Sequence, residues 1–187
     1  MKISFVIPAY NEEAYLPLCL KALQKEIVKG SYDAEVVVVN NASTDGTEAI
    51  ARSFPGVIVV NESRKGLTFA RQAGFLASSG DLVANVDADT ILPSEWLPTV
   101  MREFSNDPKL LALSGPHVYY DLSAYGRYVT HLWYLIGYPF ACLNDFLFKT
   151  GSILQGGNYI VRREALAKIG GFDTSIEFWG EDTDIAR

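Results

Sequence analysis

Residues 66–90, GLTFARQAGFLASSGDLVANVDADT, contain a helical pattern, a strand pattern and an acidic loop in succession. Small residues recur at helical spacing within residues 67–77, which suits a helix packed closely on its neighbours. The apolar run 82–86 predicts a buried strand, and Asp87 and Asp89 follow it directly. Carboxylate oxygens are ligands that hard cations such as Mg²⁺ prefer. This stretch therefore predicts a strand that ends at a cation site.

Apolar runs that resemble strands precede this stretch three times. They comprise residues 3–7, 36–39 and 57–60. Helical patterns alternate with them, and the first is predicted to begin at Asn11 as its N-cap, with Glu12 and Glu13 in its first turn. Strands that are apolar throughout and alternate with helices indicate an α/β domain, with a mainly parallel central sheet flanked by helices.

Three polar segments are expected at the carboxyl edge of that sheet: residues 8–11, 40–43 and 87–89. In open α/β sheets, ligands bind beyond the carboxyl ends of the strands. We therefore expect the three segments to share one site. No G-x-G-x-x-G motif follows the first strand, which disfavours a dinucleotide cofactor.

The second half of the chain is less regular. Ser94 is a candidate cap for a helix that reaches residue 104, and strand patterns cover residues 110–120 and 152–161. The segment 128–144 contains no Asp, Glu, Lys or Arg. Its apolar core is shorter than the roughly 20 residues that span a bilayer, so it is either a buried core helix or an interfacial or acceptor-facing one.

Composition limits the class of protein. A chain of 187 residues with 49% hydrophobic residues fits one globular domain, and its net charge of −6 disfavours a nucleic-acid partner. Cys19 and Cys142 lie in apolar stretches without metal-ligand spacing, which is typical of buried, reduced thiols in a cytoplasmic protein. The N-terminal apolar run is interrupted by Pro8 and is too short for a signal peptide.

Five segments carry a family resemblance. They are residues 6–13 (VIPAYNEE), 36–47 (VVVVNNASTDGT), 66–90 (quoted above), 156–173 (GGNYIVRREALAKIGGFD) and 179–187 (WGEDTDIAR). In this order they resemble family 2 glycosyltransferases, which have the GT-A, Rossmann-like fold of nucleotide-diphospho-sugar transferases. The resemblance implies a single domain over residues 1–187, with a nucleotide-sugar-binding half at 1–90 and an acceptor-binding half at 91–187 that is truncated at its C-terminus.

The resemblance also implies a chemistry: a metal-dependent transfer of a sugar, with inversion, from a nucleotide-diphospho-sugar donor to an acceptor hydroxyl. Asp89 is the implied direct ligand of Mn²⁺ or Mg²⁺, with Asp87 beside it at the metal and the ribose. The other implied donor contacts are Pro8, Ala9, Tyr10, Glu12, Asn40 and Arg71. Many relatives have Asp where this chain has Asn40, so the usual uridine preference is less secure here.

On the acceptor side, the resemblance assigns Asp182 as the catalytic base. Asp182 and Asp184 form a second Asp-x-Asp, which we interpret as a base-bearing segment and not as a second metal site. The implied acceptor contacts are Gly157, Asn158, Trp179 and Glu181. The two histidines, His117 and His131, match no family position and are interpreted as structural.

The implied partners are a nucleotide-diphospho-sugar and a glycan or lipid-linked acceptor of the cell envelope, with peripheral contact at the inner face of the membrane through the apolar residues 128–148. Two other functions stay open. One is a non-catalytic module that binds sugar nucleotides or docks on a membrane. The other is a sugar-phosphate nucleotidyltransferase, although such an enzyme would want a glycine-rich, basic loop after the first strand and residues 11–13 are Asn-Glu-Glu.

Overall fold

The computed structural model describes residues 1–117, 119–120, 122–148, 154–176 and 180–186. Within them, a six-stranded sheet has the order β3-β2-β1-β4-β6-β5. Its strands are β1 (Ile3–Ala9), β2 (Ala34–Asn41), β3 (Val57–Glu62), β4 (Leu82–Val86), β5 (Ala112–Ser114) and β6 (Asn158–Arg162). The first four are mutually parallel, and β6 runs antiparallel to both β4 and β5. The predicted α/β domain with a mainly parallel sheet is confirmed.

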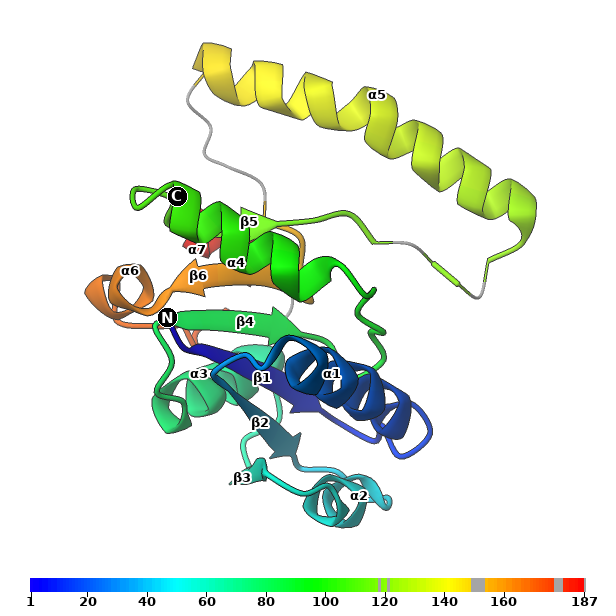
Figure 1. Ribbon diagram of the computed structural model, residues 1–187, viewed down its shortest axis with the longest axis vertical. Helices are drawn as coiled ribbons and strands as arrows, with labels where there is room; N and C mark the ends of the chain where they lie inside the picture. The colour runs from blue at the N-terminus through cyan, green and yellow to red at the C-terminus, as the bar shows by residue number, and fades with distance from the viewer. Residues whose placement is uncertain (118, 121, 149–153, 177–179, 187) are drawn as a thin grey trace.

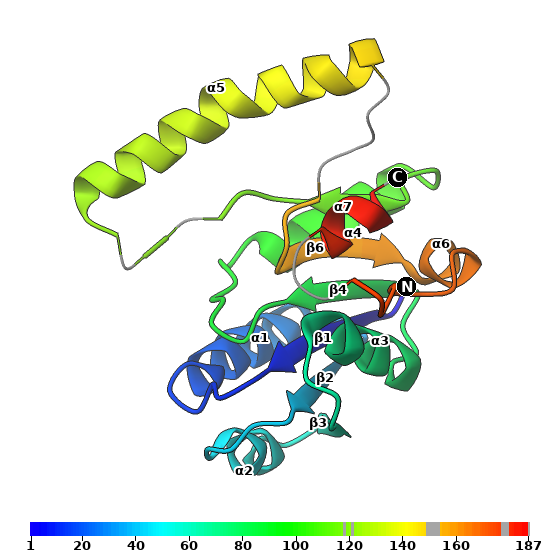
Figure 2. The ribbon, with the colours of Figure 1, turned by 180° about the vertical axis from the view of Figure 1, so that it is seen from behind.

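Helices cover both faces of this sheet (Figures 1 and 2). They are α1 (Leu16–Gly30), α2 (Thr47–Ser53), α3 (Leu67–Ala77), α4 (Trp96–Asn106), α5 (Ala124–Phe148), α6 (Arg163–Lys168) and α7 (Glu181–Ile185). One hydrophobic core joins α1 and α4 to Phe5 and Ile7 of β1. A second core joins Val6 of the same strand to Phe75 of α3 on the opposite face. Because both faces of the central strands β1 and β4 are buried, these strands are mostly apolar.

Close packing of α3 depends on a glycine. A Cβ at Gly74 would overlap the side chain of Val6 in β1. The helix lies between β1 and β2 and contacts both strands. The observed bounds of α3 and β4 agree with the predicted ones, so the acidic pair follows its strand as expected.

The start of α1 was predicted wrongly. The helix begins at Leu16, and Asn11 has a left-handed backbone with φ of 56°. The side chain of Asn11 accepts a hydrogen bond from the Thr44 N–H at 2.8 Å. Asn11 therefore joins two loops at the carboxyl edge of the sheet and does not cap a helix.

Three other predicted bounds were also wrong. Ser94 does not cap α4, which begins two residues later without a side-chain cap. The two predicted strands of the second half shorten to β5 and β6. Gly157, with φ of 72°, lies just before β6, so the backbone turns there and pairing with β4 begins only at Asn158.

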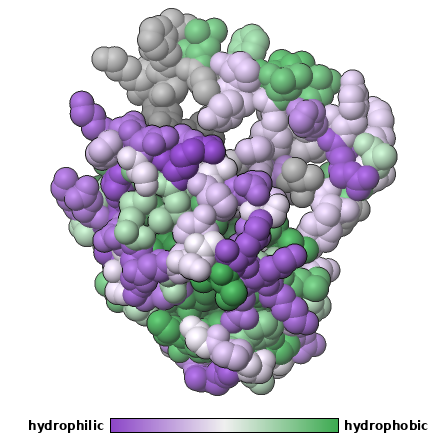
Figure 3. Space-filling model, in the orientation of Figure 1, coloured by the Kyte–Doolittle hydropathy of each residue, from purple (hydrophilic) through white to green (hydrophobic). Residues whose placement is uncertain are grey.

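The uncharged aromatic segment 128–144 lies within α5, which stands apart from the sheet in both ribbon views (Figures 1 and 2). Large side chains along it are exposed, among them Tyr125, Trp133 and Phe140, each more than 70% exposed. Figure 3 shows green, hydrophobic residues interspersed with pale-purple ones at the top of the molecule, where this helix lies. The interpretation as a buried core helix is therefore wrong for the side chains that are described. No described helix has the length and apolar character needed to cross a bilayer.

Candidate active site

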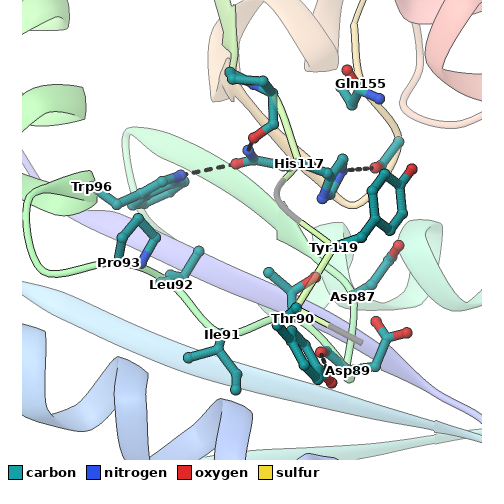
Figure 4. A pocket seen from close by; sticks show the side chains of 14 residues that line it. Asp87, Asp89, Thr90, Ile91, Leu92, Pro93, Trp96, His117, Tyr119 and Gln155 are labelled. Atoms are coloured by element: carbon teal, nitrogen blue, oxygen red, sulfur yellow. Dashed lines mark hydrogen bonds between the residues drawn. The ribbon is translucent and has the colours of Figure 1, made fainter. Parts of the chain in front are cut away.

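Asp87 and Asp89 lie between two cavities at the carboxyl edge of the sheet. The first, called here the Tyr10 cavity, has a volume of about 560 Å³ and is lined by Pro8, Ala9, Tyr10, Glu12, Asn41, Lys65, Gly66, Leu67, Ala70, Asp87, Ala88 and Asp89. The second, called here the Trp96 cavity, has a volume of about 580 Å³ and is lined by Asp87, Asp89, Thr90, Ile91, Leu92, Pro93, Trp96, Pro116, His117, Tyr119, Tyr120, Gln155, Gly156 and Asn158. In Figure 4 the two carboxylates lie at one end of the Trp96 cavity and the indole at the other.

Backbone hydrogen bonds hold the acidic loop at the end of β4. The Asp87 N–H donates to the Gly157 carbonyl at 3.3 Å, and the Asp87 carbonyl accepts from the Thr90 N–H at 3.0 Å. Ala88 between the two carboxylates is buried, while Asp89 is exposed. The loop thus presents both acidic side chains to the cavities.

Nearby carboxylates disfavour the negative charge of Asp87 and of Glu12. Burial raises the pKa of Asp87 and Asp89 raises it further, whereas Arg71 and His117 oppose that rise. Burial also raises the pKa of Glu12, with smaller contributions from Asp89 and Asp87. A cation placed between these carboxylates would relieve the repulsion, so the residues fit a hard divalent metal. Across the described ranges no three His, Cys, Asp or Glu side chains suffice to hold one, so oxygens from a bound substrate would have to complete its shell.

The Tyr10 cavity contains most of the predicted donor residues, but Asn41 lines it in place of Asn40. Adjacent strand residues point to opposite faces. The Asn40 amide donates to Asn61 Oδ1 at 3.0 Å, whereas Asn41 accepts the Gly66 N–H at 2.9 Å and donates to the Arg64 carbonyl at 2.7 Å. Asn41 therefore orders the loop that ends at α3.

That loop places a cation above Tyr10. Lys65 Nζ donates to the Tyr10 hydroxyl at 2.6 Å and lies 3.9 Å from the centre of its ring. The contact combines a hydrogen bond with a cation–π interaction. Of the side chains that line the Tyr10 cavity, Lys65 is the one that carries positive charge.

Arg71 lies beneath the acidic loop and lines neither cavity. Its side chain is 1% exposed, bonds Glu181 through Nη1 and lies 3.4 Å from Asp87 Oδ1 through Nη2. Burial disfavours its charge, but the acidic groups around it outweigh burial and raise the pKa of Arg71. The donor-binding role of Arg71 and the acceptor-binding role of Glu181 stay predictions. In the structure, the pair ties α3 and α7 to the acidic loop.

The glycine loop before β6 lies between the acidic pair and Asp182. The Gly156 N–H donates to Asp182 Oδ2 at 3.1 Å, and the Thr183 N–H donates to Oδ1 at 2.8 Å. On its other side, Gly157 contacts Asp87, and a Cβ there would overlap that carboxylate. Asp182 itself lines neither cavity, but it holds Gly156, which lines the Trp96 cavity.

Asn158 is anchored in the wall of the Trp96 cavity. Its Oδ1 accepts a hydrogen bond from Trp96 Nε1 at 2.8 Å, and its amide donates to the Gly115 carbonyl at 3.1 Å. Trp179, the aromatic residue among the predicted acceptor contacts, lies outside the described residues.

Several residues of these cavities were not predicted from the sequence: Asn41, Lys65, Trp96, His117, Tyr119 and Gln155. Asn41 could have been predicted, because it follows Asn40 directly and adjacent residues of a strand point to opposite faces, so one of the two had to face the cavity. For His117 and Gln155 no local pattern exists, since the fold brings them together from separate loops.

Cys19 is buried, as predicted, and the side chain of Cys142 lies outside the described part of the chain. Burial, with contributions from Asp89 and Asp87, raises the pKa of Cys19 to about 12. The thiol beneath the acidic loop therefore stays neutral at physiological pH.

Comparison with known proteins agrees with this geometry. The sequence profile of glycosyl transferase family 2 matches residues 4–170, and the chain belongs to this family. It is 37% identical over 101 residues to the glycosyltransferase AglE of Haloferax volcanii, which covers 51% of this chain and 33% of that protein. It is 34% identical over 109 residues to the prophage bactoprenol glucosyl transferase homolog of Escherichia coli K12, covering 56% and 36%.

Among solved structures, the chain resembles the mannosyltransferase PcManGT from Pyrobaculum calidifontis, determined in complex with GDP-Man and Mn²⁺. The TM-score is 0.68 at 27% identity, over 98% of this chain and 51% of that one. The likeness establishes the GT-A glycosyltransferase fold. The matches span about a third of the length of AglE and of the Escherichia coli protein, and about half of the length of PcManGT.

Proposed function

We propose that this chain transfers a sugar from a nucleotide-diphospho-sugar to an acceptor hydroxyl. The observation that carries the proposal is the meeting of two cavities at Asp87 and Asp89. A donor in the Tyr10 cavity and an acceptor in the Trp96 cavity would then face each other across the acidic pair. A related mannosyltransferase was solved with GDP-Man and Mn²⁺, which supports the same class of donor here.

On the donor side, the exposed ring of Tyr10 and the Lys65 ammonium above it offer a platform for a planar base. The diphosphate would lie toward Asp89 and Asp87, which would hold a divalent cation, Mn²⁺ or Mg²⁺, together with the phosphate oxygens. Such a cation would neutralise the charge that develops on the departing nucleoside diphosphate. Asp89 is the direct ligand in this proposal, since Asp87 is also engaged by Arg71.

On the acceptor side, Asp182 is the proposed general base. Two backbone N–H groups, from Gly156 and Thr183, orient its carboxylate. Asp182 takes the proton of the acceptor hydroxyl while the acceptor oxygen forms a bond to the anomeric carbon. The bond from that carbon to the diphosphate oxygen breaks on the opposite face, so the configuration inverts.

For the acceptor, we propose a lipid-linked or cell-envelope glycan at the inner face of a membrane. Relatives at 34% identity and above include a protein named as a bactoprenol glucosyl transferase homolog. Aromatic side chains in the Trp96 cavity suit a hydroxylated headgroup, and the exposed α5 provides apolar surface beside it. Peripheral contact of this kind needs no helix that crosses the bilayer.

A turnover assay tests the proposal. The chain is supplied with Mn²⁺, a lipid-linked glycan acceptor that carries free sugar hydroxyls and GDP-mannose or UDP-glucose, and nucleoside diphosphate release is measured. Asp182→Asn should lower kcat at least 100-fold while donor Kd stays within about twofold. Asp184→Asn, an exposed carboxylate on the same helix, is the matched control and should retain activity.

Two results would contradict the proposal in different ways. Donor binding without turnover in the wild-type chain would support a non-catalytic sugar-nucleotide module. Formation of a sugar nucleotide from a sugar phosphate and a nucleoside triphosphate would support a nucleotidyltransferase.

A further inference from the structure

Both backbone groups of Gly156 are held by side chains that lie far apart in the sequence. Its N–H donates to Asp182 Oδ2 at 3.1 Å. Its carbonyl oxygen lies 2.9 Å from His117 Nε2. Because a carbonyl oxygen only accepts hydrogen bonds, the Nε2 atom of His117 must carry the proton. One residue therefore links the imidazole to the proposed base.

Gly156 needs such restraint, because glycine is the residue with the most backbone freedom. A Cβ at this position would lie 3.3 Å from Asp182 Oδ2, so the carboxylate packs close to the glycine Cα. Gln155 before it is anchored through its N–H to Ser114 Oγ at 2.7 Å. On the side of Gly156 that leads to β6, His117 holds the Gly156 carbonyl oxygen.

The backbone of His117 is in turn held by a side chain of α5. Its backbone N–H donates to the Tyr134 hydroxyl oxygen at 3.2 Å, and Tyr134 belongs to α5. The His117 ring also lies beside Tyr119, with ring centroids 6.3 Å apart. In Figure 4 the ring lies in the wall of the Trp96 cavity, with a dashed line to a backbone oxygen of the glycine loop.

We propose that His117 is a positioning residue for the catalytic base. By holding the Gly156 carbonyl, it fixes the peptide plane between Gly156 and Gly157 and with it the position of the Gly156 Cα. The Gly156 N–H on the other side of that Cα then stays directed at Asp182 and keeps its carboxylate at the edge of the Trp96 cavity. The inference rests on the proposed function of Asp182. It gives a role to a histidine that sequence patterns alone indicate to be structural.

The first test is kinetic and uses both histidines of the chain. His117→Ala should lower kcat about tenfold or more with little change in donor Kd, because a small displacement of a catalytic group costs rate and not donor affinity. His117→Gln carries a side-chain amide that can donate to the same carbonyl, so it should recover most of the rate. His131→Ala, an exposed position on α5, is the control and should behave as the wild type.

The second test needs no turnover. The Gly156 amide proton should report the ionisation of Asp182 in a pH series of ¹⁵N–¹H NMR spectra, and Asp182→Asn should abolish that response. In His117→Ala the response should fall sharply, and in His117→Gln it should return. Identical titrations of the Gly156 amide in wild type and His117→Ala would overturn the inference.

The two tests separate the inference from the function on which it rests. If the wild-type chain transfers sugar and His117→Ala has the same kcat, the inference is overturned and the proposed function still holds. If the wild-type chain neither binds nor consumes a sugar nucleotide, the proposed function is contradicted. The pH response of the Gly156 amide proton then decides by itself whether His117 orients Asp182.

Discussion

Gly157 shows how much of this site depends on single residues. Its φ of 72° belongs to the left-handed region, and a Cβ would overlap the Asp87 carboxylate. Its carbonyl accepts the Asp87 N–H. The glycine thus sets both the backbone and the side-chain position of the first carboxylate.

We therefore expect Gly157→Ala to weaken Mn²⁺-dependent donor binding at least tenfold, because the Asp87 carboxylate must move. Gly56→Ala is the matched control: Gly56 has a similar φ of 76°, but no atom lies within 4 Å of its would-be Cβ. It should lose about 1 kcal/mol of stability and keep donor affinity. Calorimetric titration measures both affinities, and equal donor binding by the two variants would contradict this account.

The acidic pair could be predicted from the sequence, because a strand that ends in two carboxylates is a local pattern. The contacts of Arg71 and His117 could not. Their partners lie 16 to 110 residues away, and only the folded chain reveals whether a basic side chain meets a ligand or a buried carboxylate. A family resemblance places residues in a site without specifying which of them touch the substrate.

At the scale of elements, Arg71 joins α3 to α7 and to the loop after β4. Arg71→Met should lower the free energy of unfolding by about 3 kcal/mol, because it leaves Glu181 buried without its cation. The double variant Arg71→Met with Glu181→Gln should be less destabilised than the single one. Urea denaturation measures the difference.

The matched control is the exposed pair of Arg52 and Glu48 on α2. Arg52→Met should change the free energy of unfolding by less than about 1 kcal/mol. Equal losses for Arg52→Met and Arg71→Met would show that the Arg71 pair does not join these elements.

Glu35 joins elements at the opposite, amino edge of the sheet. Burial alone would raise the pKa of Glu35, but hydrogen bonds from Lys2, Ser4 and Ser79 outweigh burial and lower the pKa to about 2. A carboxylate with a lowered pKa stabilises the fold above its ordinary pKa of 4.5, and that contribution is lost as pH falls from 4.5 toward 2.

We expect Glu35→Gln to cost about 1–2 kcal/mol at pH 7, and the difference from wild type to shrink as pH falls through this range. Urea denaturation across a pH series measures it. Glu164→Gln, an exposed glutamate, should differ little from wild type at any pH. A deficit for Glu35→Gln that stays constant from pH 7 to pH 3 would contradict the assignment.

At the scale of the whole molecule, most of the fold was predictable. Continuous apolar runs alternating with helical ones determine a parallel sheet and the edge at which its ligands bind. The placement of α5 was not predictable, because an uncharged aromatic run of that length has the same pattern whether it is buried or exposed. Large side chains of α5 are exposed, and its Tyr134 hydroxyl accepts the N–H of His117, a residue that lines the Trp96 cavity.

The central claim is that Asp89 and Asp87 hold a divalent cation and a donor diphosphate between the two cavities. Calorimetric titration of GDP-mannose and UDP-glucose, with and without Mn²⁺, tests it most directly. Asp33→Asn serves as the control, because Asp33 is exposed and precedes β2 at the opposite edge of the sheet.

Mn²⁺ should strengthen binding of at least one donor tenfold or more in the wild type and in Asp33→Asn, and Asp89→Asn should abolish that gain. Unchanged Mn²⁺-dependent binding in Asp89→Asn, or no binding of either sugar nucleotide to the wild type, would contradict the claim.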